Sequence, residues 1–177
     1  MMQSLVLTVL SDDRPGVVDE LSAVIAAHKG VWVESRMASL AGKFAGLLRV
    51  RAPSAQVEAL GAALAALESR GLHVQLEVAD GARQPVADAH SLRIELVGPD
   101  RPGIVHQIAH ALAERGISVD ELTTEVSDAS MAGGELFRAS AVLQLPAGIS
   151  SEALEEQLDA LGNELTLDIE VEVLDDD

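Results

Sequence analysis

The sequence contains no cysteine, which excludes disulfides, thiolate zinc sites and thiol nucleophiles. It also lacks tyrosine and has one tryptophan and two phenylalanines, so aliphatic side chains must build the core. Basic residues are scarce: 12 Lys and Arg stand against 29 Asp and Glu, for a formal net charge of -17. Because phosphate binding needs clustered basic residues, this balance argues against direct binding to nucleic acid or to an anionic membrane surface. A small-molecule or protein partner is the better expectation.

Long apolar runs are absent too. No run approaches the ~20 residues that a membrane-spanning helix needs, and the first residues lack the basic and apolar regions of a secretory signal. We therefore expect a cytoplasmic protein. The sequence shows no Ser-His-Asp order, P-loop lysine, dinucleotide-binding glycine pattern or metalloprotease helix. We accordingly expect a protein that is not an enzyme and needs no cofactor.

One four-residue motif occurs twice. Asp13-Arg14-Pro15-Gly16 returns as Asp100-Arg101-Pro102-Gly103, a shift of 87 residues, and each copy lies between an apolar strand pattern and a helical pattern. Aspartate is favoured at a helix N-cap and proline at the first helical position, so each copy is predicted to feed a strand directly into a helix. The free N-H groups of such a helix end attract anions.

Hydrophobic periodicity gives the same order of elements in both halves: strand, helix, strand, strand, helix, strand. In the first half, Gly30 is predicted to cap the first helix, and a hairpin turn is predicted at Ala41-Gly42-Lys43. We predict one domain over residues 1–79, a linker over 80–90 and a second domain over 91–177.

This order predicts the α+β class, with two ferredoxin-like βαββαβ domains, each a four-stranded antiparallel sheet with both helices on one face. Leu47 in the first sheet, with Leu136 and Val142 in the second, would be exposed on the open faces. We therefore expect the halves to pack together or the protein to form a homo-oligomer.

The strand, Asp-Arg-Pro-Gly turn and helix inside a βαββαβ unit resemble the ACT domain, a module that binds amino acids at domain interfaces and regulates another activity. The resemblance covers Leu5 to Val78 and Leu92 to Val173. In more detail, the chain resembles the subfamily of glycine cleavage system transcriptional repressors. The residues that carry this finer resemblance are Glu34-Ser35-Arg36-Met37-Ala38, Gly42 and Phe44 in the first half, and Asp120-Glu121-Leu122, Thr124, Met131 and Gly133-Gly134-Glu135-Leu136-Phe137 in the second.

The resemblance implies that the two turns bind a small amino acid. The helix N-H groups would receive its carboxylate, Asp13 or Asp100 would accept its ammonium group, and the glycines would allow close approach. In ACT domains, a residue at the start of the second strand, often Asn, completes the pocket. Here Trp32 and Ser118 stand in the corresponding places, and because Trp32 could fill its pocket we favour the second turn. The candidate ligand-binding residues are Asp13, Arg14, Pro15, Gly16, Trp32, Asp100, Arg101, Pro102, Gly103 and Ser118.

Each of these candidate features also has a purely structural interpretation. The motif is also a good helix-start turn without any ligand, and its arginines are expected to be exposed or paired with a carboxylate rather than to contact ligand. Trp32 is expected to serve as interface core. His106 and His110 have a spacing that can hold a metal, yet no further ligand lies near them in the sequence, so a solvated helix flank is expected.

The resemblance implies an amino-acid-responsive regulator that senses glycine or a similar amino acid and acts on a transcriptional activator protein without touching DNA. The alternative is a constitutive protein-interaction or dimerisation module whose ligand pockets do not function. A third hypothesis, an acyl phosphate hydrolase on the same fold, needs a catalytic Asn and Arg around a phosphate loop. The chain's one Asn, Asn163, lies far along in the last helical pattern.

Overall fold

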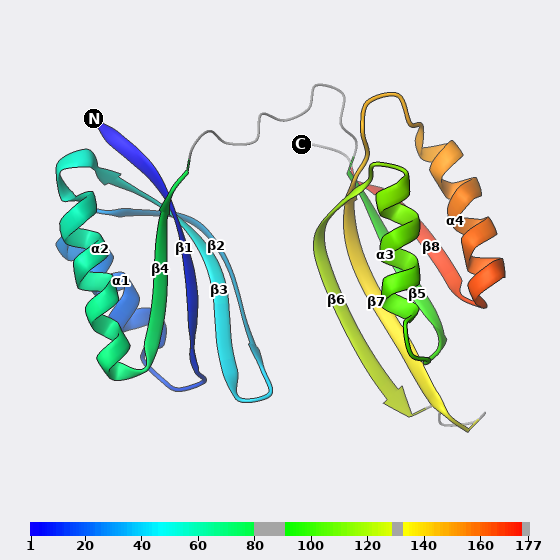
Figure 1. Ribbon diagram of the computed structural model, residues 1–177, viewed down its shortest axis with the longest axis horizontal. Coiled ribbons are helices and arrows are strands. Elements are labelled where there is room, and N and C mark those ends of the chain that lie inside the picture. Colours follow the sequence, from blue (N-terminus) through cyan, green and yellow to red (C-terminus); the bar gives the residue numbers. More distant parts are fainter. Residues whose placement is uncertain (80–90, 129–132, 175–177) are drawn as a thin grey trace. The chain divides into compact units, whose positions relative to one another are not determined.

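The computed structural model describes residues 1–79, 91–128 and 133–174 of the 177-residue chain. These residues form two compact units, unit 1 within residues 1–82 and unit 2 within residues 83–177 (Figure 1). The predicted linker over residues 80–90 and Met131 lie outside the described residues. Within the described ranges, no helix is both long enough and apolar enough to span a bilayer.

Both units have the predicted order of elements. Unit 1 contains β1 (Met2–Asp12), α1 (Val17–Ala27), β2 (Val31–Leu40), β3 (Lys43–Pro53), the 3₁₀ turn η1 (Ser54–Gln56), α2 (Val57–Ala66), the 3₁₀ turn η2 (Leu67–Arg70) and β4 (Leu72–Val78). Unit 2 contains β5 (Ser91–Pro99), α3 (Ile104–Glu114), β6 (Ser118–Asp128), β7 (Glu135–Gln144), α4 (Ser151–Leu165) and β8 (Asp168–Leu174).

Each unit has one four-stranded antiparallel sheet, in the order β2-β3-β1-β4 in unit 1 and β6-β7-β5-β8 in unit 2. Both helices of a unit cover the same sheet face, so each unit is a two-layer ferredoxin-like domain (Figure 1). The predicted fold class is therefore confirmed. The first strand of each unit lies in the centre of its sheet, which places the turn that follows it at the end of the helix layer.

In the central strands, buried residues alternate with residues that face away from the helices. In β1, Leu5, Leu7 and Val9 are buried against the helices, while the residues between them face the other side of the sheet. The two units have separate cores, and both are mainly aliphatic, as the scarcity of aromatic residues predicts. Leu47 is exposed on the open face of the first sheet, and Leu136 and Val142 are half-buried in the second.

The predicted C-cap of the first helix is wrong. α1 ends at Ala27, and the residue in the left-handed region is Lys29, with a φ of 58°, rather than Gly30. The Gly30 N-H donates to the Ile25 carbonyl at 2.9 Å, and a Cβ built on Gly30 would lie 2.6 Å from the Ile25 side chain. Gly30 is thus required by close packing, not by its φ angle. The predicted hairpin turn is confirmed at Ala41 and Gly42, both with positive φ as a two-residue hairpin requires.

Candidate functional site

The repeated turn adopts the same backbone geometry in both units. Gly16 has φ 92° and ψ -3°, and Gly103 has φ 85° and ψ 3°. These are the angles of the third residue of a type II turn, in which proline is favoured just before the glycine. The glycine therefore serves as the N-cap, and α1 and α3 begin one residue later, at Val17 and Ile104.

The prediction of an aspartate N-cap followed by a helical proline is wrong for both copies. Each aspartate instead extends the pairing of the central strand: the Asp13 N-H donates to the Gly42 carbonyl and the Asp100 N-H to the Glu135 carbonyl, both at 2.9 Å. The Pro-Gly turn then separates strand from helix. Both aspartates and both N-cap glycines, Gly16 and Gly103, are exposed.

No side chain caps the N-terminus of α3. The Ile104 N-H donates to the Arg101 carbonyl at 3.3 Å and the Gln107 N-H to the Gly103 carbonyl at 3.0 Å. Between them, the N-H groups of Val105 and His106 have no acceptor within the described part of the chain. Uncapped amides at a helix N-terminus carry partial positive charge, so the second turn presents donors suited to a carboxylate.

The arginines of the two turns make equivalent long-range contacts. Arg14 Nη2 donates to the Arg70 carbonyl at 3.3 Å, and Arg101 Nη2 donates to the Leu165 carbonyl at 3.2 Å. Both carbonyls belong to the C-terminal end of the second helical segment of their unit, where a cation satisfies free carbonyls and the helix dipole. The arginines thus connect the turn to the second helix.

Arg14 also forms the carboxylate pair that the sequence suggested. Its two terminal nitrogens lie 2.8 and 3.1 Å from the two carboxylate oxygens of Glu20, a bidentate geometry. Hydrogen bonding to Arg14 holds the pKa of the Glu20 carboxyl below its ordinary value and raises the pKa of Arg14. In unit 2, Gln107 takes the place of Glu20. The second turn therefore lacks this internal pair.

A hollow of about 410 Å³ with both polar and apolar walls reaches Pro99, the residue before the second turn. It begins at Pro99, immediately before Asp100, and it extends to the C-terminal end of α4 and to the first residue of β8. Asn163, Thr166 and Asp168 supply its polar groups. The carboxylate-bearing residue Asp168 lines this hollow, whereas Asp100, Arg101, Pro102 and Gly103 are not among its lining residues.

Strand register corrects the predicted match between Trp32 and Ser118. Trp32 pairs with Val50, and Val119 pairs with Leu143, the β7 residue that occupies the position of Val50 in its sheet. Trp32 therefore corresponds to Val119, and Ser118 lies one residue earlier. β2 and β6 each contain a bulge just beyond this point, and bulges leave no mark in the alternation of residues.

The two units differ in how they fill the space between their first helix and their second strand. In unit 1, Trp32 and Met37 pack against the core, and Trp32 Nε1 donates to Ser35 Oγ at 3.3 Å. In unit 2 the same positions hold Val119 and Thr124.

These smaller side chains leave an apolar groove of about 30 Å³ between α3, β6 and β7. Its walls include Val105, Ile108, Leu112, Val119, Leu122 and Ala141, and we call it the α3/β6 groove. Trp32 therefore packs against the core of its own unit, whereas the sequence analysis expected it in an interface; in unit 2 only the small groove remains at this place. Val105 belongs both to the groove and to the uncapped first turn of α3.

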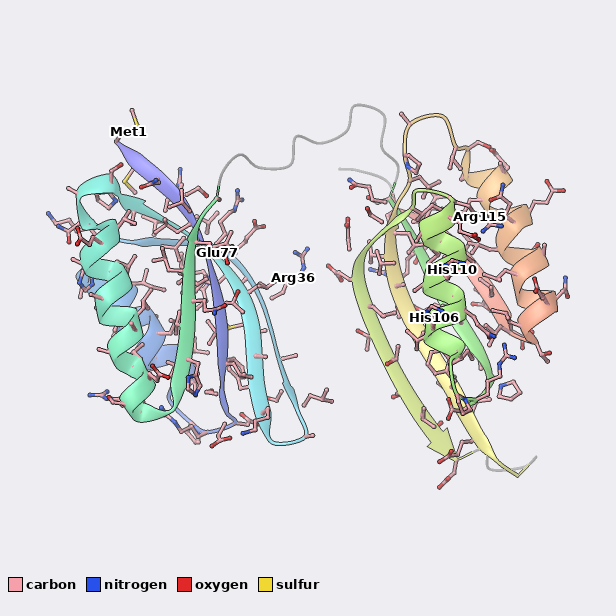
Figure 2. The ribbon with its side chains drawn as sticks, in the orientation of Figure 1. Met1, Arg36, Glu77, His106, His110 and Arg115 are labelled. Atoms are coloured by element: carbon pink, nitrogen blue, oxygen red, sulfur yellow. The ribbon has the colours of Figure 1, made fainter. Side chains whose placement is uncertain are left out.

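The histidine pair shows no metal site. His106 and His110 lie one turn apart along α3, with ring centroids 5.9 Å apart (Figure 2). His110 Nε2 lies 3.5 Å from a carboxylate oxygen of Glu114, one turn further on. Over the residues that the structure describes, no group of three or more histidines and carboxylates could hold a metal ion.

Comparisons with known proteins identify the family. Two family models, each described as the ACT domain, match the chain over residues 3–78 and 92–162. The chain belongs to the ACT domain family. Each matched segment contains one Asp-Arg-Pro-Gly turn and the helix that follows it, so the resemblance implied by the repeated turn is confirmed for both units.

Solved structures cover both ACT domains together. A crystal structure of an unknown protein from Galdieria sulphuraria is 29% identical, with a TM-score of 0.81 over 99% of this chain and 100% of that one. A structure titled "putative glycine cleavage system transcriptional repressor" is 18% identical, with a TM-score of 0.75 over 99% of both chains. It shares the tandem ACT fold. None of the curated proteins matches this sequence.

Proposed function

We propose that this tandem ACT protein is a regulator that binds a small amino acid at the turn Asp100 to Gly103 and acts through a protein partner. Membership of the ACT family supports a regulatory role. The observation that carries the choice of turn is the smaller Val119 of unit 2 in the position of Trp32, which packs against the core of unit 1; both α1 and α3 begin without a side-chain cap. Glycine is the first amino acid to test, by likeness to the structure titled as a glycine cleavage repressor.

The chemistry of a free amino acid fits this turn. Its carboxylate would accept hydrogen bonds from the N-H groups of Val105 and His106, and its ammonium group would donate to the exposed carboxylate of Asp100. Gly103 has nothing within 4 Å of an added Cβ, so its backbone is open to a ligand. The first turn is the weaker candidate because the bulky Trp32 stands in unit 1 where unit 2 has the smaller Val119.

Ligand binding at this turn would affect three elements that the turn contacts or begins. The Asp100 N-H holds the start of β7, the Arg101 guanidinium holds the end of α4, and α3 begins at the next residue after Gly103. A ligand changes a protein's affinity for its partner only if it favours one of two arrangements. The turn offers such a point of control because it joins these elements.

Isothermal titration calorimetry of the intact chain with glycine, serine and alanine tests this proposal. We expect saturable binding of at least one of them, abolished by Asp100→Ala and retained by Asp13→Ala, with unchanged circular dichroism for both variants. Absence of binding by the folded chain to any small amino acid would refute sensing. The alternative, a constitutive interaction module with non-functional pockets, predicts partner affinity that amino acids do not alter.

A further inference from the structure

We propose that a hollow on the open face of the first sheet binds a small aliphatic carboxylate, with its carboxylate group on the Arg49 guanidinium and its apolar part over Val6 and Leu47. Residues of β1, β2 and β3 line this hollow, which we call the β2/β3 hollow. It lies on the sheet face that the two helices of unit 1 leave uncovered (Figure 1). The site is therefore separate from the second turn, and it does not rest on the proposed function.

The size of the hollow limits the ligand. Its volume is about 290 Å³. Since a water molecule takes up about 30 Å³ in the liquid, this space corresponds to roughly ten water-sized groups. Val6 is half-buried in its floor, and Leu47 is 56% exposed at its wall. A short aliphatic chain laid against these two side chains would remove apolar surface from water.

Arg49 offers free donors at a fixed position. Its Nε is buried and lies 2.7 Å from a carboxylate oxygen of Glu34, in a geometry that is not a hydrogen bond. This ion pair holds the guanidinium beside β2, and within the described residues Nη1 and Nη2 of Arg49 donate to no other group. The N-H groups of a guanidinium match the two oxygens of a carboxylate.

The charges around the hollow favour a ligand without an ammonium group. Besides Arg49, Arg36 lines the hollow, and its side chain extends away from the ribbon in Figure 2. Arg36 has a partner of its own, so Arg49 alone is assigned the carboxylate. An ammonium group beside that carboxylate would be repelled by the guanidiniums, and its only charged acceptor among the lining residues, Glu34, already lies against Arg49. A simple carboxylic acid therefore fits better than a free amino acid.

The corresponding face of unit 2 lacks these features. Strand register places Val142 where unit 1 has Arg49, so β7 offers no guanidinium there. Ser140 stands where unit 1 has Leu47, and its hydroxyl donates to a carboxylate oxygen of Glu95 at 2.6 Å. An apolar wall beside a free guanidinium is thus particular to unit 1, and we assign the carboxylate site to that unit alone.

Isothermal titration calorimetry of the intact chain with sodium 4-methylpentanoate tests the proposal. We expect saturable binding with half-saturation at about 1 mM, which is typical for a ligand of about eight non-hydrogen atoms. Arg49→Gln should weaken this binding by at least about tenfold, because it removes the charged donors. Arg93→Gln is the matched control: the Arg93 side chain is 44% exposed against 41% for Arg49, and it also pairs with a carboxylate on a neighbouring strand. It should leave binding unchanged.

A ligand series separates the two parts of the site. Acetate keeps the carboxylate without the chain, and 4-methylpentan-1-ol keeps the chain without the charge, so both should bind much more weakly than 4-methylpentanoate. Leucine adds an ammonium group to the same skeleton. In the Asp100→Ala variant, which disables the proposed amino-acid site, leucine should also bind more weakly than 4-methylpentanoate.

Other outcomes would overturn the proposal. If Arg49→Gln does not fold, Leu47→Ser tests the apolar wall at an exposed side chain, and it should weaken binding severalfold. No saturable binding far above the expected half-saturation, unchanged binding in the Arg49 or Leu47 variant, or an equal loss in Arg93→Gln would contradict the assignment. So would tighter binding of leucine than of 4-methylpentanoate to the Asp100→Ala variant. A dimer in sedimentation equilibrium that Leu47→Ser converts to monomer would do the same, because a second copy would then cover the hollow.

The two ligand sites fail separately. If glycine binds to the intact chain and 4-methylpentanoate does not, only the β2/β3 hollow falls as a site. If 4-methylpentanoate binds and no small amino acid does, the hollow stands and sensing at the second turn falls.

Discussion

The left-handed backbone conformation of Lys29 allows a quantitative test of the structural match between the two units. It lies between α1 and β2 with a φ of 58°, and Gly116 occupies the corresponding position in unit 2 with a φ of 70°. A residue with a Cβ in the left-handed region costs roughly 1–2 kcal/mol, whereas glycine costs about 0.5–1 kcal/mol of additional chain entropy. Lys29→Gly should therefore stabilise unit 1 by about 0.5–1 kcal/mol.

Urea unfolding followed by tryptophan fluorescence measures this change. The only tryptophan, Trp32, packs against the core of unit 1, so its signal reports that unit. With a denaturant slope of about 1 kcal/mol per molar urea, the midpoint should rise by about 0.5–1 M.

Lys29→Ala is the matched control, because it removes the charged side chain and keeps the Cβ. The strain should remain, and the midpoint should not rise. An equal gain for alanine and glycine would show that lysine's side chain, not its backbone angle, limits stability. A loss of stability in Lys29→Gly would refute the reasoning altogether.

Three further outcomes concern unit 1 and use the same fluorescence assay. Because Arg14 lowers the folded-state pKa of Glu20, this ion pair stabilises the unit above the ordinary carboxyl range of about pH 4, and its contribution disappears as the pH falls through the lowered value. Arg14→Ala should thus destabilise more at pH 7 than in acid, where only the hydrogen bond to the Arg70 carbonyl remains to be lost; a constant difference at all pH values would contradict this. Gly61→Ala, in α2 with nothing within 4 Å of an added Cβ, should stabilise by about 0.5–1 kcal/mol, and no gain would argue against a regular helix there. Gly46→Ala should destabilise by about 1–3 kcal/mol, because its Cβ would overlap the Met37 side chain on β2; a neutral result would mean that β2 yields easily.

The sequence was sufficient to predict the architecture because the relevant signals are local and repeated. Alternation of buried Leu and Val marks the strands, and two copies of one turn fix the frame of both halves. The details at the turn were not predicted correctly. Proline followed by glycine satisfies both a helix start and a type II turn, and only the left-handed φ of Gly16 and Gly103 distinguishes the two.

Side-chain packing across elements was beyond the sequence. The match of Trp32 with Val119, by contrast, follows from the 87-residue shift between the two turns, and the strand register confirms it. The α3/β6 groove arises from small residues on β6 and β7, such as Thr124 and Ala141, that are far apart in the sequence. The contacts from Arg14 and Arg101 to the ends of the second helices likewise join segments more than 50 residues apart.

A crystal structure of the protein grown with glycine would test the proposed site most directly. We expect electron density for one amino acid at the second turn, with its carboxylate against the Val105 and His106 amides and its ammonium group toward Asp100. Density only at the first turn, or a second turn that stays empty at saturating glycine, would contradict the assignment.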